Sequence, residues 1–146
     1  MTKRKSLYLI ACTTDKFKGI NQRAKYIYAK SVLFRLSYLY IKKEYKPKTI
    51  YVLSAKYGLI SENDLISYYD DNLVNKRKID RKLWAKNVIK QLDKLMKGKR
   101  ENYKLICFAG DKYVEFLKKE FLIERPLEKL TIGYQIEWLK KKLSPN

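Results

Sequence analysis

The sequence contains no histidine and only two cysteines, Cys12 and Cys107. The absence of histidine excludes Ser-His and Cys-His catalysis, His-ligated zinc and imidazole general bases. Both cysteines lie in apolar runs, so neither a disulfide scaffold nor a cysteine metal cluster is predicted, and a reducing, cytoplasmic location is expected. We predict no cofactor and no metal site, although Asp70, Asp71 and Asp111 are side chains of the kind that bind magnesium.

Long hydrophobic runs are also missing. The apolar stretch near the N-terminus extends only from Leu7 to Cys12 before Asp15 and Lys16 follow, which is too short for a signal peptide or a membrane span. No amphipathic basic helix and no lipidation motif stand out. We therefore predict no membrane partner.

Acidic residues are scarce. The chain has 34 Lys and Arg but 15 Asp and Glu, which leaves a net charge of +19. A charge of this size attracts polyanions, and nucleic acid or a nucleotide is the expected partner. The alternative is a compositional bias that enriches lysine, isoleucine, tyrosine and asparagine without selecting a function.

The length of 146 residues fits one α/β domain spanning 1–146, and a hydrophobic share of 46% suffices for a continuous core. Three runs are apolar on both faces, as parallel strands covered by helices are: 6–12, 49–54 and 103–109. Helical periodicity lies between and after them, at about 24–39, 80–96, 111–119 and 133–142, with Asp80 and Asp111 placed as caps.

This alternation predicts a three-layer α/β sandwich with a mainly parallel, Rossmann-like sheet. The span 60–80 has no clean period and is expected to be the longest irregular connection.

Small, hydroxylic or basic residues follow each predicted strand. Ligands of open parallel sheets bind beyond the carboxyl ends of the strands, so these segments should converge on a binding site, with backbone amides facing a phosphate. The alternative is that the small residues only turn the chain and that the lysines are solvated. The candidate binding residues are Cys12, Thr13 and Lys16 after the first strand, Tyr57 and Gly58 after the second, and Gly110, Lys112 and Tyr113 after the third.

The irregular span adds Tyr69 beside Asp70, and aromatic rings in a basic cleft offer stacking platforms for bases. If the protein is an enzyme, Lys56 is the candidate electrostatic clamp or amine nucleophile and Asp70 the candidate base, while Ser54 and Tyr69 supply hydrogen bonds. The alternative is that Ser54 and Asp70 fix their loops through capping and turn hydrogen bonds.

Several of these residues carry a family resemblance. The run from Leu53 to Ile60, followed by Tyr69-Asp70, resembles a widespread uncharacterised bacterial, archaeal and phage domain family with S-x-K-Y-G-L and P-Y-D motifs. The segment 132–139, I-G-x-Q-x-x-W-L, extends the resemblance and adds Gly133 and Gln135 to the candidate binding residues. Thr14, where lysine is frequent, and Ser67-Tyr68, where proline commonly precedes the tyrosine, depart from the pattern.

The same motifs are distantly similar to the YaaA peroxide-stress proteins. That resemblance implies DNA binding and attaches no established reaction. We expect a nucleic-acid- or nucleotide-binding protein with a basic pocket at the strand ends, acting in DNA modification, damage or phage-related processes. Two alternatives remain open: an enzyme acting on a nucleobase or N-glycosidic bond through Lys56 and Asp70, and a phage or mobile-element accessory protein that binds a host protein.

Overall fold

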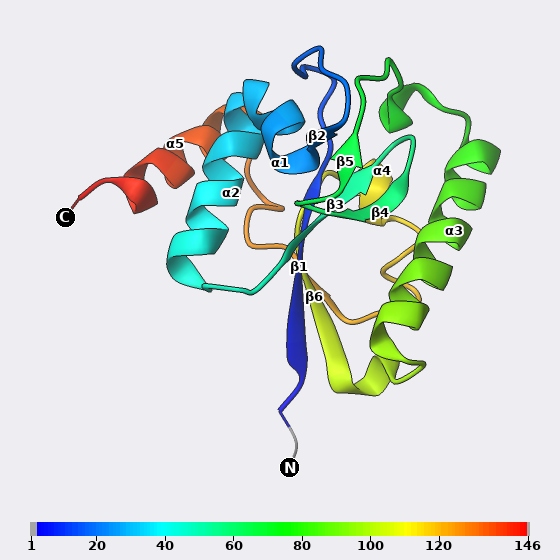
Figure 1. Cartoon of the computed structure of the whole chain (residues 1–146). Helices are drawn as coiled ribbons and strands as arrows, with labels where there is room; N and C mark the ends of the chain where they lie inside the picture. The colour runs from blue at the N-terminus through cyan, green and yellow to red at the C-terminus, as the bar shows by residue number, and fades with distance from the viewer. Residues whose placement is uncertain (1–2, 146) are drawn as a thin grey trace.

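Three buried parallel strands form the centre of the protein, close to where the sequence places them. A computed structural model describes residues 3–145, and in it β1 (Lys5–Ala11) lies between β3 (Ile50–Ser54) and β6 (Tyr103–Phe108). Their side chains are apolar on both faces because helices cover the sheet on both sides. This register brings the carboxyl ends of all three strands to one edge of the sheet (Figure 1).

Two further strands complete a five-stranded sheet with the order β4-β3-β1-β6-β7. β4 (Gly58–Ser61) returns antiparallel to β3 as a hairpin, and the two-residue β7 (Ile123–Glu124) runs parallel to β6. The span expected to be irregular thus contains the end of β4, the short strand β5 (Leu65–Ile66) paired with β2 (Gln22–Arg23), and a 3-10 turn, η2 (Leu73–Asn75). Strands of two to four residues are too short to show a periodicity.

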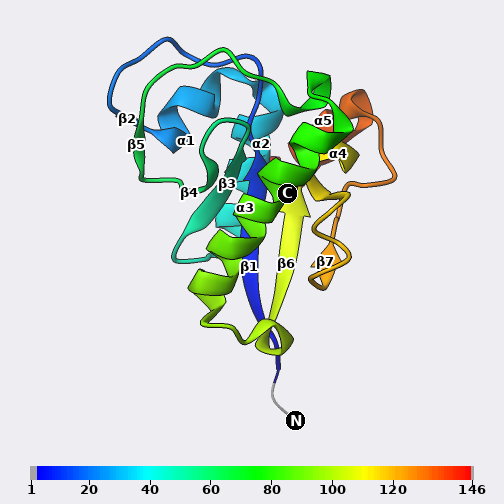
Figure 2. The ribbon, with the colours of Figure 1, turned by 90° about the vertical axis from the view of Figure 1, so that its right-hand side faces the viewer.

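Helices cover both faces of the sheet and make the predicted three-layer sandwich. α2 (Val32–Glu44) and α5 (Ile132–Leu143) pack together on one face, and α3 (Lys78–Met96) lies on the other (Figures 1 and 2). The short helices α1 (Ala24–Ile27) and α4 (Asp111–Val114) lie near the carboxyl ends of the strands.

Helix boundaries differ from the sequence expectation at the caps. The periodicity from residue 24 is divided between α1, the 3-10 turn η1 (Tyr28–Lys30) and α2, because the Ser31 hydroxyl accepts a hydrogen bond from Phe34 N and starts a new helix. Asp80 does not cap α3, since the helix begins at Lys78 and the carboxylate binds Arg77 instead. Asp111 likewise lies inside α4, one residue after the N-cap Gly110.

Candidate functional site

A cavity lies at the point in the sheet that has β3 and β4 on one side, next to β1, and β7 on the other side, next to β6. From β1 the chain crosses to β3, whereas from β6 it crosses to β7 on the opposite side, so the carboxyl ends of β1 and β6 form a topological switch point. The cavity has a volume of about 240 Å³ and lies beside these two strand ends. α2, α4, α5 and the segment after β7 complete its wall; the lining residues are Ile10, Ala11, Cys12, Thr13, Leu33, Phe34, Ser37, Cys107, Phe108, Ala109, Gly110, Tyr113, Arg125, Leu127, Glu128, Ile132 and Gln135.

Cys12 joins all three strand ends in the wall of the cavity. Its amide donates to the Leu53 carbonyl (2.9 Å), and its Sγ accepts from Ala55 N (3.2 Å) and lies 3.3 Å from the Tyr113 hydroxyl. Burial, together with the neighbouring Cys12, raises the pKa of Tyr113 far above its usual range. The phenol is therefore neutral at physiological pH and remains a hydrogen-bond donor.

Gln135 and Thr13 supply polar groups to the same wall. The Gln135 Nε2 amide donates to the carbonyls of Leu127 (3.1 Å) and Leu130 (2.9 Å), which fixes the chain between β7 and α5. Within residues 3–145 nothing donates to the Gln135 Oε1 oxygen, so this acceptor has no partner in the described part of the chain. The Thr13 hydroxyl donates to the Asp15 carbonyl (2.8 Å) and stiffens the turn after β1.

Arg125 is a wall residue that sequence reasoning missed. Its side chain is 13% exposed; the guanidinium donates from Nε (3.2 Å) and Nη2 (2.8 Å) to the Ala109 carbonyl and pairs through Nη1 with Asp111 (2.8 Å). It follows β7, a fourth parallel strand whose two residues carry no detectable pattern. The expectation that binding residues follow the carboxyl ends of parallel strands is here called the strand-end rule. Applied to β7, this rule would have included Arg125.

Ser54, Tyr28 and Tyr69 form a buried hydroxyl cluster outside the cavity wall. The two phenol oxygens are 2.7 Å apart, and Ser54 Oγ lies 3.0 Å from that of Tyr69 and 3.3 Å from that of Tyr28. Burial raises the pKa of both tyrosines far above the usual range, so the cluster is neutral. Ser54 Oγ also accepts from the amides of Lys56 (3.3 Å) and Tyr57 (3.1 Å), which is the turn-fixing role left open by the sequence.

Gly58 is buried against α3 rather than against the cavity. Its φ is +74°, and an added Cβ would lie 2.4 Å from the Gln91 Oε1 atom. The Gln91 carboxamide holds both backbone groups of Leu59, accepting from its amide (2.7 Å) and donating to its carbonyl (3.1 Å). Glycine is therefore required here by the packing of the hairpin on the helix.

None of the three lysines that follow the strands lines the cavity. Lys16 is only 4% exposed, and its ammonium group donates to the carbonyls of Thr13 (2.9 Å) and Thr14 (3.3 Å) and lies 4.5 Å above the Tyr69 ring. Lys56 is exposed on the β3–β4 turn, and Lys112 is exposed on α4. Lys16 thus stabilises its own loop, and the other two are solvated.

The remaining predicted residues also lie outside the wall. Asp70 is exposed, Tyr57 packs edge-to-face on Tyr69 with ring centroids 5.6 Å apart, and Gly133 is exposed in the first turn of α5. The structure therefore brings together Cys12, Thr13, Gly110, Tyr113 and Gln135, and separates them from Ser54, Lys56 and Asp70.

The family of the chain follows from a comparison with known protein families. A model described as a family of unknown function (DUF6884) matches residues 7–141. The chain belongs to this family. No curated protein and no solved structure matches the chain. The matched segment includes every residue of the cavity wall.

The chemistry available at this site is recognition by shape, by hydrogen bonds and by an arginine paired with carboxylates. Its wall is mainly apolar and aromatic, and its polar groups include Tyr113, Gln135 and the pair of Arg125 with Glu128 (3.5 Å). Among the described residues, no three His, Cys, Asp or Glu side chains gather as a metal site. No helix in residues 3–145 is long and apolar enough to cross a membrane.

Proposed function

We propose that the cavity binds the base of a nucleotide, either free or at an unstacked position of a nucleic acid. The position of the cavity carries this proposal. In sheets whose parallel strands follow the order seen here for β3-β1-β6-β7, ligands bind at the switch point beside the first strand, as the flavin does in flavodoxin-like proteins.

The size and lining of the cavity support a small planar ligand. Pockets for drug-sized molecules hold about 300 to 1,000 Å³, and this one is somewhat smaller. Phe34 and Phe108 contribute aromatic rings to a mainly apolar wall, on which a base can pack. The free Oε1 of Gln135 can accept a hydrogen bond from the edge of the base, which gives the wall a means of orienting it.

Charge supports a ligand that carries phosphate. The net charge of +19 attracts anions to the whole surface, and Arg125 is the cation of the cavity wall, where a phosphate would compete with its two carboxylate partners, Asp111 and Glu128. If the resemblance of the sequence motifs to YaaA proteins reflects a shared function, it implies the same class of partner and a role in DNA modification or damage. Lys56 and Asp70 lie outside the cavity wall, so we assign no reaction to them.

Calorimetric titration with the common ribonucleoside and deoxyribonucleoside 5′-monophosphates tests the proposal, with ribose 5-phosphate as a ligand that lacks the base. Ser37 is a buried wall residue on α2, and Ser37→Leu fills the cavity. We expect binding of at least one nucleotide, loss of that binding in Ser37→Leu and full retention in Lys56→Ala, which changes an exposed residue outside the wall. Equal binding by wild type and Ser37→Leu, or no binding of any nucleotide, would contradict the proposal.

A further inference from the structure

All five lysines of α3 lie on a single row of the helix. They are Lys78, Lys82, Lys86, Lys90 and Lys94, each four residues from the next, and all are exposed. Four residues of helix rise about 6 Å, so the row is about 24 Å long. Lysines scattered by compositional bias alone would also occupy the other rows of a 19-residue helix.

No carboxylate in residues 3–145 pairs with this row. The two acidic residues of α3 are both bound to arginines: Asp80 to Arg77 (3.0 Å), and Asp93 to Arg100 through two hydrogen bonds of 2.6 and 2.7 Å. Among residues 3–145, none of the five lysines takes part in an ion pair. Like charges four residues apart destabilise a helix, so the arrangement weakens α3 unless an anion compensates it.

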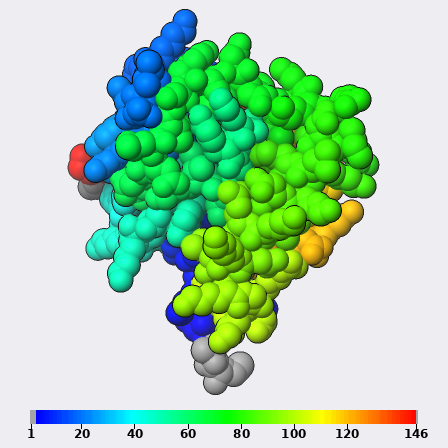
Figure 3. Space-filling model, turned by 45° about the vertical axis from the view of Figure 1, so that its right-hand side comes forward, coloured from blue at the N-terminus to red at the C-terminus, as the bar shows by residue number. Residues whose placement is uncertain are grey.

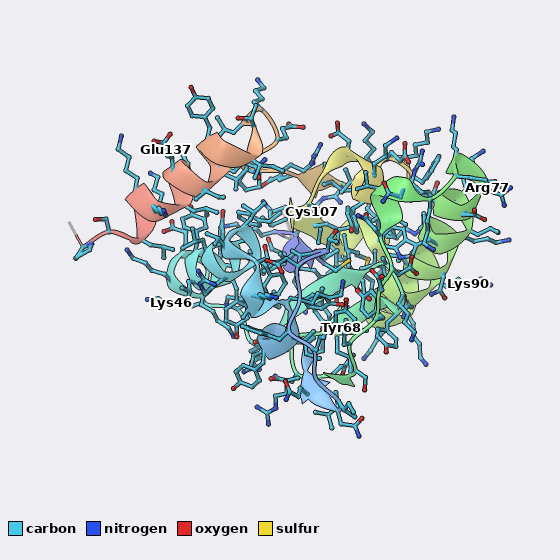
Figure 4. The ribbon with its side chains drawn as sticks, turned by 90° about the horizontal axis from the view of Figure 1, so that it is seen from above. Lys46, Tyr68, Arg77, Lys90, Cys107 and Glu137 are labelled. Carbon is cyan, nitrogen blue, oxygen red and sulfur yellow. The ribbon has the colours of Figure 1, made fainter. Side chains whose placement is uncertain are left out.

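The row winds round the exposed side of α3, because each step of four residues turns it by about 40°, and it continues beyond the helix. The buried side of α3 carries Ala85, Val88, Leu92 and Met96. In Figure 4, Lys90 lies at the outer edge of the molecule, far from Cys107 in the sheet. Below the last turn of α3 a hollow of about 410 Å³ is lined by four more exposed lysines, Lys3, Lys5, Lys97 and Lys99, and Figure 3 shows the N-terminal segment lying at this lower end of the helix.

We infer that these nine lysines, here called the lysine track, bind the phosphate backbone of a nucleic acid duplex. A duplex presents one phosphate per about 3.4 Å of its axis on each strand, so the α3 row is about as long as seven base pairs of duplex. The track is a second surface, on the face of the sheet opposite α2 and α5, and its action does not require a ligand in the cavity.

Other partners fit the lysine track less well. A helix that lies on a membrane buries a broad apolar face in the lipid. The apolar face of α3 is already packed on the sheet, and the only large apolar side chains that α3 exposes are Ile79 and Leu83. Protein interfaces are depleted in lysine at their centres, whereas phosphate contacts depend on lysine and arginine.

The test compares two triple variants with equal charge. Lys82→Gln/Lys86→Gln/Lys90→Gln removes the middle of the track, and Lys48→Gln/Lys140→Gln/Lys141→Gln removes three exposed lysines elsewhere; each lowers the net charge from +19 to +16, since 19 − 3 = 16. Binding to a fluorescein-labelled 24-base-pair DNA duplex is measured by anisotropy between 50 and 300 mM salt.

Each phosphate contact adds about 0.9 to the slope of log K against log salt, so the track variant should lose about 2.7 of slope and on the order of 500-fold in affinity at 0.1 M salt. The control variant should keep the wild-type slope, and Ser37→Leu should also bind duplex normally, so that failure of the cavity proposal is recognised separately. Thermal melting should show the track variant at least as stable as wild type, because like-charge repulsion is removed.

Equal losses in both triple variants would overturn the inference, because net charge alone would then explain binding. So would undiminished duplex binding by the track variant. Binding to phosphatidylserine vesicles that the track variant abolishes, without any binding to duplex, would overturn it in favour of a membrane surface. A single Lys86→Glu reversal repeats the comparison should the triple variant melt early, with a loss of affinity expected and its absence contradicting the inference.

Discussion

Replacing Gly58 by alanine is expected to lower the free energy of unfolding by about 3 kcal/mol. Two costs add up at this position. A residue with a Cβ pays about 1 to 2 kcal/mol for the left-handed conformation that Gly58 adopts at φ +74°. The new methyl group would also lie 2.4 Å from Gln91 Oε1 and displace the carboxamide, which forfeits two hydrogen bonds to Leu59 worth about 0.5 to 1.5 kcal/mol each.

Gly98 provides a matched control, because it has the same φ of +74° and nothing within 4 Å of an added Cβ. Gly98→Ala should therefore cost only the conformational term, about 1 to 2 kcal/mol. The assay is urea unfolding at equilibrium, followed by tryptophan fluorescence and evaluated with a common slope for all variants.

A double-mutant cycle separates the two costs at Gly58. Once Gln91→Ala has removed the carboxamide, the additional effect of Gly58→Ala should fall toward that of Gly98→Ala, since the closer steric partner is gone and only Asn87 Nδ2, at 2.9 Å, remains. If Gly58→Ala and Gly98→Ala prove equally destabilising in the wild-type background, the packing argument is refuted, and the glycine would have to be explained by a ligand.

Three further outcomes follow from buried polar groups. Tyr69→Phe should cost about 1 to 2 kcal/mol in thermal melts, because Tyr28 and Ser54 lose a hydrogen-bond partner. Because burial raises the pKa of Tyr69 in the folded protein, this tyrosine ionises at a lower pH in the unfolded chain than in the folded one. The free energy of unfolding should therefore fall as pH rises above 10, by up to about 1.4 kcal/mol per pH unit per buried tyrosine. Tyr69→Phe should make this fall less steep. Burial opposes ionisation of Glu62, but hydrogen bonds, first among them that from Tyr38, outweigh it and lower the pKa of Glu62, so stability should decline as pH falls below 4.5, and less steeply in Glu62→Gln.

The central strands and layers were predictable because β1, β3 and β6 are five to seven residues long and apolar on both faces. A run of this length can be recognised as a buried strand from its own residues alone. β7 has two residues and is recognised only by its pairing with β6, a contact that no local pattern encodes. Arg125 was missed for that reason.

Cys12, Gly110 and Tyr113, which the strand-end rule selected, lie in the cavity wall, because their positions follow from strand direction and topology alone. The rule does not say which way a side chain turns. Lys16 folds back onto the carbonyls of its own loop, and Ser54 lies inside a hydroxyl cluster; both outcomes depend on Tyr69, which arrives from a segment without periodicity.

The most recognisable run of the sequence, from Ser54 to Gly58, is accounted for by folding. Ser54 closes the hairpin turn with two amide hydrogen bonds, and Gly58 leaves room for Gln91. Between them, Lys56 is exposed, and its side chain contacts the ring of Tyr57. A residue pattern identifies a fold whether its members bind a ligand or hold a turn. The cavity wall, by contrast, is assembled from separate segments whose members have little local signature, so the functional hypothesis depends on topology and the lysine track on helical spacing. The Gly58 cycle therefore tests whether packing explains the sequence motif, and the two triple lysine variants test whether the arrangement of charge on α3 selects the partner.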